Sequence, residues 1–300
     1  MWLMLAFCSA VLLGFYDVCK KQSLGGNAVI PVLTLNTLFS SLIFSPFIVL
    51  SLSGGIAPDS SLYAGSPGGA AHFYVFLKSL IVLSSWIFGY FAMKHLPLTI
   101  VGPINATRPV MVLVGALLVF SERLNGYQWV GVALAILSFF LLSRSGKREG
   151  IDFRHNRWIL FLVLAAALGA VSGLYDKYLM GELGLRPLFV QSWYNLYQLV
   201  EMALVLLCLW WPRRKSGTPF CWRWSIPLIS VFLSAADFVY FYALSCDGSM
   251  ISVVSMVRRS SVVVSFLCGA LLFHEKNLRG KAVDLALVLL GMFFLYLGSR

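Results

Sequence analysis

The sequence alternates long apolar runs with short polar breaks. Ten of the runs are long enough to cross a bilayer, which requires about 20 predominantly apolar residues. They cover residues 2–18, 28–52, 72–93, 97–120, 126–143, 158–179, 188–211, 225–245, 249–273 and 280–298. Because each run is continuous and does not alternate between apolar and polar positions, the pattern predicts helices and excludes a transmembrane β-barrel. We therefore expect an all-α integral membrane protein with ten transmembrane helices.

The composition also indicates a membrane protein. Only 12% of the 300 residues are charged and 59% are hydrophobic, whereas a soluble domain carries about 25% charged residues. The formal net charge of +11 indicates topology rather than nucleic-acid binding, because most Lys and Arg residues lie in the breaks. Of these 23 residues, 15 lie in odd-numbered breaks and 3 in even-numbered breaks or at the termini. This bias predicts a multi-pass protein of the inner (cell) membrane with both termini outside the cytoplasm.

A motif near the start of the chain occurs again in its second half. The segment GFYDVCKKQSLGG begins at Gly14, and GLYDKYLMGELGL begins 159 residues later at Gly173. Aligned pairs are Tyr16 with Tyr175, Asp17 with Asp176, Asn36 with Asn195 and, at a slightly smaller offset, Arg108 with Arg259. Five helices are therefore repeated, and an odd number makes the second copy enter the membrane from the opposite side. We expect two inverted five-helix repeats, 1–144 and 158–300, joined by a basic linker at 145–157.

The fourth and ninth runs end in similar segments, LLVFSERLNG and LLFHEKNLRG, and YQWVGVALAILS follows the first of them. With ten helices in two repeats, these segments resemble the drug/metabolite transporter superfamily, in its EamA-like ten-helix branch. The resemblance implies transport of small molecules through a central cavity, lined mainly by helices other than the fifth and tenth. Such proteins more usually keep both termini in the cytoplasm, and here we follow the charge count instead.

Arginines in the middle of two runs are the first candidates for function. A mid-membrane arginine costs at least ~2.5 kcal/mol, so Arg108, Arg258 and Arg259 are expected to face a cavity or a partner. One interpretation is a site for an anionic substrate, and the other is internal ion pairing. Because adjacent residues point about 100° apart on a helix, we favour Arg259, the repeat counterpart of Arg108. Asp237 either binds a proton for coupling or neutralises an arginine.

Further polar and aromatic residues complete the predicted site. Asn36 and Asn195 contact either a ligand or a neighbouring helix, and aromatic residues line the cavity or simply pack. The predicted substrate-binding residues are Arg108, Arg259, Asp237, Asn36, Asn195, Gln191, Trp86, Tyr90 and Tyr240. The predicted gating or coupling residues are Asp17, Asp176, Tyr16 and Tyr175. Lys78, near the start of the third run, is expected to extend toward the lipid headgroups.

These features together predict a secondary active transporter of a small anionic metabolite, working by alternating access around a midplane cavity. The alternatives are a flippase for a lipid-linked substrate, or an exporter of a neutral metabolite, amino acid or drug. The sequence has no HExxH, Gly-x-Ser-x-Gly or Walker motif and no His/Cys cluster, so we expect no enzyme activity, metal or cofactor. Expected partners are the substrate, the lipid bilayer and a coupling proton or counter-substrate, for a monomer or homodimer without nucleic acid.

Overall fold

The computed structural model contains residues 1–300. It describes all of them except residues 1, 61, 66, 109, 112–114, 116–124, 148–154, 213, 216, 246–256, 259, 275–277 and 299–300. All secondary structure in the described residues is helical. The first half contains α1 (Trp2–Leu24), α2 (Val29–Leu52), α3 (Gly69–His95), α4 (Leu98–Ala106) and α6 (Gly126–Lys147). The second half contains α7 (Arg157–Lys177), α8 (Pro187–Val205), α9 (Ser225–Ser245), α11 (Ser261–Leu272) and α12 (Leu278–Gly298), with π-helical turns η1 (Tyr178–Glu182) and η2 (Leu206–Trp210).

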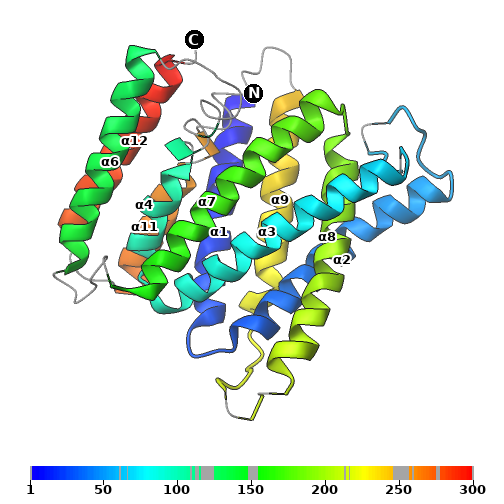
Figure 1. Ribbon diagram of the computed structural model, residues 1–300, viewed down its shortest axis with the longest axis horizontal. Coiled ribbons are helices and arrows are strands. Elements are labelled where there is room, and N and C mark those ends of the chain that lie inside the picture. Colours follow the sequence, from blue (N-terminus) through cyan, green and yellow to red (C-terminus); the bar gives the residue numbers. More distant parts are fainter. Residues whose placement is uncertain are drawn as a thin grey trace.

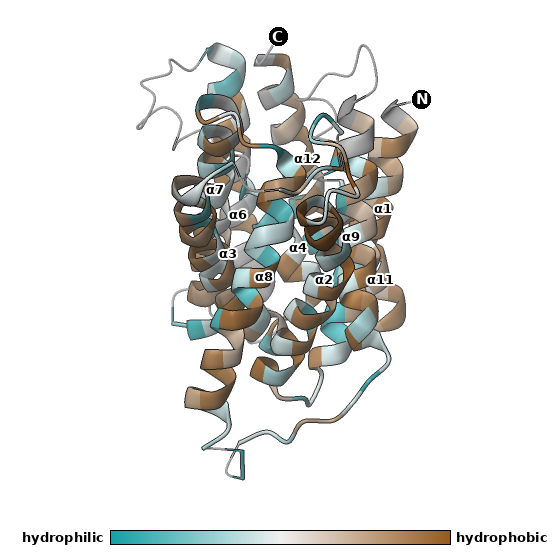
Figure 2. Ribbon diagram, turned by 90° about the vertical axis from the view of Figure 1, so that its right-hand side faces the viewer, coloured by the Kyte–Doolittle hydropathy of each residue, from teal (hydrophilic) through white to brown (hydrophobic). Residues whose placement is uncertain are grey.

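The helices have the length and composition of membrane spans. Five in the described residues are long and apolar enough to cross a bilayer, namely Val29–Leu52, Gly69–His95, Arg157–Asp176, Pro187–Trp210 and Leu278–Gly298. Shorter apolar helices include Gly126–Ser138, Ser225–Tyr240 and Ser261–Leu272. Figure 2 shows mostly apolar helices, with hydrophilic positions concentrated along α8. The chain is therefore an integral, multi-pass membrane protein.

The described helix boundaries agree closely with seven of the predicted runs; parts of the fourth and ninth runs lie outside the described residues, and the first run differs. That run was predicted to end at residue 18, whereas α1 continues to Leu24. Lys20 lies inside this extension and is only 8% exposed, because its ammonium group lies 4.3 Å from the centre of the Tyr90 ring. This contact offsets part of the cost of keeping a cation in the helix. Asp17 is consequently about 10 Å from the end of its helix, not at the end as the run suggested.

The connections between helices gather at two ends of the bundle. At one end, Lys21 donates hydrogen bonds to the carbonyls of Met93 and Leu96. At the same end Asn27 donates to the Cys221 carbonyl at 2.7 Å, so three odd-numbered breaks meet there. The N and C termini lie together at the opposite end (Figure 1).

The main helix contacts keep their pattern when each helix is exchanged with its counterpart in the other half. α1 packs against α9 as α7 packs against α3, and α3 packs against α8 as α2 packs against α9. The pairs α2–α8, α4–α11 and α6–α12 each exchange with themselves. Because α1 ends and α7 begins at the same end of the bundle, these equivalent helices run in opposite directions (Figure 1).

Two glycines of the first half allow close approaches to helices of the second half. A Cβ atom at Gly14 of α1 would lie 2.4 Å from Val264 of α11. A Cβ atom at Gly115 would lie 2.6 Å from Leu174 of α7. Both glycines therefore permit contacts that an added methyl group would block.

Candidate functional site

Polar side chains gather inside the bundle, where lipid cannot reach them. Gln191, Asn195 and Gln198 of α8 follow one helix face and are each at most 6% exposed. Asn36 of α2 is fully buried and accepts a hydrogen bond from Ser230 of α9 at 2.8 Å. Groups of this kind are costly in hydrocarbon, so their burial on facing helices marks the polar interior of the protein.

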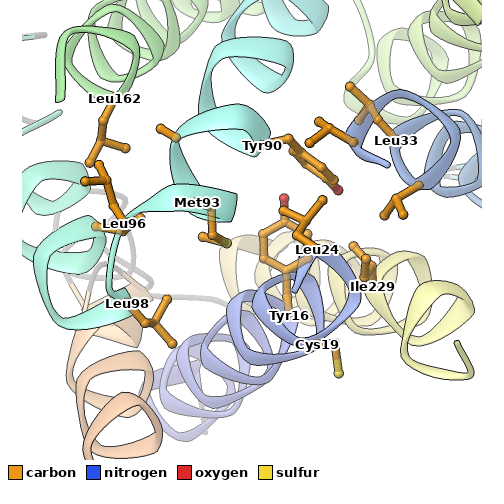
Figure 3. Packing of buried hydrophobic residues seen from close by; sticks show 14 of the residues in the cluster. Tyr16, Cys19, Leu24, Leu33, Tyr90, Met93, Leu96, Leu98, Leu162 and Ile229 are labelled. Atoms are coloured by element: carbon orange, nitrogen blue, oxygen red, sulfur yellow. The ribbon is translucent and has the colours of Figure 1, made fainter. Parts of the chain in front are cut away.

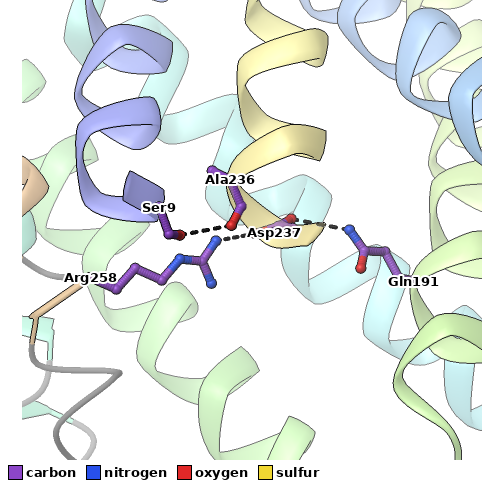
Figure 4. Close-up of polar contacts among 5 residues, drawn as sticks. All are labelled: Ser9, Gln191, Ala236, Asp237 and Arg258. Carbon is purple, nitrogen blue, oxygen red and sulfur yellow. Dashed lines mark hydrogen bonds and ion pairs between the residues drawn. The ribbon is translucent and has the colours of Figure 1, made fainter. Parts of the chain in front are cut away.

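Asp237 of α9 lies at the centre of one group (Figure 4). Its Oδ1 atom pairs with the guanidinium of Arg258, and its Oδ2 atom accepts a hydrogen bond from Gln191 Nε2 at 3.1 Å. The Arg258 guanidinium also lies 4.3 Å from the centre of the Tyr240 ring. Of the two roles predicted for Asp237, neutralisation of an arginine is therefore seen directly. The partner is Arg258, while the favoured Arg259 lies outside the described residues.

Asp17 of α1 lies in a second group. Its Oδ2 atom accepts a hydrogen bond from Ser265 of α11 at 3.0 Å, and its charge interacts with those of Lys20 and Arg108. The Lys20 ammonium lies 3.4 Å from the Tyr16 hydroxyl. The group therefore contains two cations and one carboxylate.

Lys20 was missed as a candidate because the charge count placed it in the first break. The signal available in the sequence was its position one turn after Asp17, on the same helix face.

Arg108 follows α4 and extends toward α7. A Cβ atom at Gly169 would lie only 2.9 Å from Arg108 Cζ, so the glycine leaves room for the guanidinium. Arg108 Nε is buried and has no hydrogen-bond partner among the described residues. Tyr16 lies near enough to both Arg108 and Asp237 for their charges to act on it, so it lies between the two groups. The hydroxyls of Tyr16 and Tyr90 point toward the same region (Figure 3).

Asp176, the repeat counterpart of Asp17, forms an ion pair with Lys78 of α3. Lys78 is only 6% exposed, and its ammonium lies 5.0 Å from the centre of the Tyr194 ring. The prediction that Lys78 extends to the headgroups is therefore wrong, because a carboxylate inside the bundle holds it. Tyr175 donates a hydrogen bond from its hydroxyl to the carbonyl of Tyr74 at 3.2 Å.

The side chain of Asn36 joins two helices, whereas Asn195 meets a neighbouring helix only through its backbone carbonyl. Ser41 of α2 donates to the carbonyl of Asn195 at 2.8 Å, and Asn195 Nδ2 donates to the Gln191 carbonyl at 2.8 Å. Trp86 is partly buried and packs against the main hydrophobic core. No group of three His, Cys, Asp or Glu side chains suited to a metal ion occurs in the described part of the chain.

Comparisons with known proteins agree with this architecture. The chain is similar to a solved structure described only as "Crystal structure of protein", with a TM-score of 0.62 and 17% identity. The similarity covers 99% of this chain and 98% of the other, so the shared fold extends over both halves. No curated protein matches the chain.

A family model also matches the first half of the sequence. Residues 1–144 match the EamA-like transporter family, whose members are membrane transporters of small molecules rather than enzymes. The resemblance inferred from the repeated helix-end segments is thereby confirmed. The match places the first half of the chain in the drug/metabolite transporter superfamily.

Proposed function

We propose that the protein is a secondary active transporter of a small anionic metabolite, and that Arg108 binds the anionic group of the substrate. The observation that carries the proposal is the group around Asp17, where Lys20 and Arg108 share a single carboxylate. By contrast, Lys78 and Arg258 each pair with a carboxylate of their own.

The excess positive charge favours an anionic ligand. A cation inside a membrane protein is costly without a partner, and a carboxylate or phosphate supplies one. The guanidinium of Arg108 is suited to this because its planar donors match the oxygens of such anions. Gly169 leaves the space beside it.

Alternating access is supported by the exchange of helix pairs between the halves. Equivalent helices run in opposite directions, as expected for inverted repeats related by an axis in the membrane plane. In such an arrangement the two halves rock about a central site, and each opens one side of the membrane. The distribution of Lys and Arg supports an inner-membrane location with both termini outside the cytoplasm.

Transport in proteoliposomes tests the proposal. Purified protein is screened by thermal shift against a library of anionic and neutral metabolites, and each ligand found is then tested in counterflow. We expect anions to bind and exchange, and Arg108→Ala to lower their affinity about 100-fold through loss of a charge-assisted contact. Arg108→Lys is the matched control and should retain part of the binding. Normal anion transport by Arg108→Ala, or transport of neutral compounds alone, would contradict the proposal.

A further inference from the structure

Arg258 and Asp237 form an ion pair through one guanidinium nitrogen and one carboxylate oxygen, not through two parallel hydrogen bonds. Arg258 contacts only the Oδ1 atom of Asp237 in the described residues, and Gln191 donates a hydrogen bond to the Oδ2 atom. Arg258 Nε is buried and has no hydrogen-bond partner within the described ranges. An arginine normally offers two parallel donors to one anion. Arg258 therefore keeps donor capacity that Asp237 does not use.

The surroundings of Asp237 make Arg258 its main electrostatic partner. Charged or titratable groups that interact with it from neighbouring helices are Arg258, Tyr16 of α1 and Tyr194 of α8. Tyr240, on α9 itself, lies against the Arg258 guanidinium. Tyrosines are neutral at physiological pH. In the described part of the chain, the charge of Asp237 is thus balanced through contact with Arg258 alone.

We infer that Asp237 is a proton-binding site that couples substrate transport to proton movement. The inference rests on the proposed function, because it assumes an anionic substrate. A proton from water adds to the Asp237 carboxylate and forms a neutral carboxylic acid. Arg258 keeps its positive charge, releases the neutral Asp237 and joins Arg108 in contacting the anionic group of the substrate. Proton and anion then cross together and leave together, which restores the ion pair.

Electrostatics inside the bundle requires that Asp237 is protonated when the anion binds. Release of Arg258 from a charged Asp237 leaves a buried carboxylate unpaired, which is strongly unfavourable. Entry of an anion without a proton places two negative groups on one guanidinium. Gln191 is suited to both states, because its amide donates to the carboxylate and, after turning over, accepts from the carboxylic acid.

Proton uptake during binding tests the inference directly. Weakly buffered, detergent-solubilised protein is mixed with inorganic phosphate or with pyruvate, as a phosphate and a carboxylate probe. A pH-indicating dye reports protons, and calorimetry reports binding. We expect the wild-type protein to take up one proton for each anion bound, beyond the probe's own protonation. Asp237→Asn should bind the same probe about tenfold more tightly at neutral pH, without proton uptake.

Asp284→Asn is the matched control, because Asp284 is also a buried carboxylate, at 2% exposure, but lies on α12. It should take up protons as the wild type does. Binding without proton uptake by the wild type, or equal uptake by Asp237→Asn, overturns the inference and leaves the proposed function intact. The wild-type measurement decides the matter even where Asp237→Asn does not fold. A wild-type protein that binds neither probe contradicts the proposed function, and the inference with it.

Discussion

Asp17 and Asp176 occupy the same place in the repeated motif, yet their surroundings differ. Asp17 accepts a hydrogen bond from Ser265 of α11 and has Lys20 one turn away on its own helix. Asp176 pairs with Lys78, which comes from α3, and its side chain is 34% exposed. One carboxylate belongs to a group with excess positive charge, and the other belongs to a neutral pair.

The packing of the helices and the partners of the two carboxylates behave differently. The main helix contacts follow the exchange between the halves, because they depend on extended backbone packing. The partners of the two carboxylates do not follow it, because one substitution on a facing helix is enough to change them. The two copies of the motif therefore place their carboxylates in different electrostatic surroundings.

The largest expected effect is on the neutral pair. Lys78→Met leaves Asp176 without its cation, and we expect a loss of about 2 kcal/mol in stability. The value is below that for a fully buried pair because the Asp176 side chain is 34% exposed. Thermal unfolding in detergent measures it. Lys78→Met/Asp176→Asn should recover most of the loss, whereas equal destabilisation of single and double variants would show that the ion pair is unimportant.

A smaller effect is expected at Asp17, where the substitution should strengthen anion binding. Asp17→Asn keeps an acceptor for Ser265 but leaves Lys20 and Arg108 without a negative charge. An anionic substrate should therefore bind about tenfold more tightly and leave more slowly. Equilibrium binding and efflux rates from proteoliposomes measure the two changes. Weaker anion binding in this variant would mean that Asp17 contacts the substrate directly.

The smallest effect is expected at Gly169. A methyl group there meets the Arg108 guanidinium, whose flexible side chain can shift by a few tenths of an ångström. We expect Gly169→Ala to weaken anion binding about threefold with little change in thermal stability. Gly89→Ala is the control, because its Cβ would lie 3.6 Å from Ala165 in an ordinary contact between α3 and α7. Identical anion binding by the two variants would show that Gly169 does not contribute to the site.

Much of the fold was predictable because a membrane helix can be recognised from the apolar length of its own sequence. Apolar length sets the helices, and seven of the ten predicted runs agree with described helices, while parts of the fourth and ninth runs lie outside the described residues. The exception at the end of α1 has a tertiary cause, since the ring that accommodates Lys20 belongs to Tyr90, 70 residues later. A count of local charges cannot detect such a partner.

The site was predictable as a set of costly residues, but its pairing was not. Asp237 and the arginines stood out because ionisable groups in apolar runs are expensive. Which charges meet depends on helix rotation, so Lys78 and Asp176, 98 residues apart, were not recognised as partners. The sequence did not single out Gly169, because its importance depends on the Arg108 side chain that lies against it.

The helix pair α6–α12 is joined to α4 by polar contacts as well as by apolar packing. Lys281 of α12 is fully buried and donates to the Thr99 hydroxyl of α4 at 2.8 Å, while Ser138 joins α6 to α12 at the Asp284 carbonyl. A movement that separates α4 from α12 would have to break the bond between the Lys281 ammonium and the Thr99 hydroxyl.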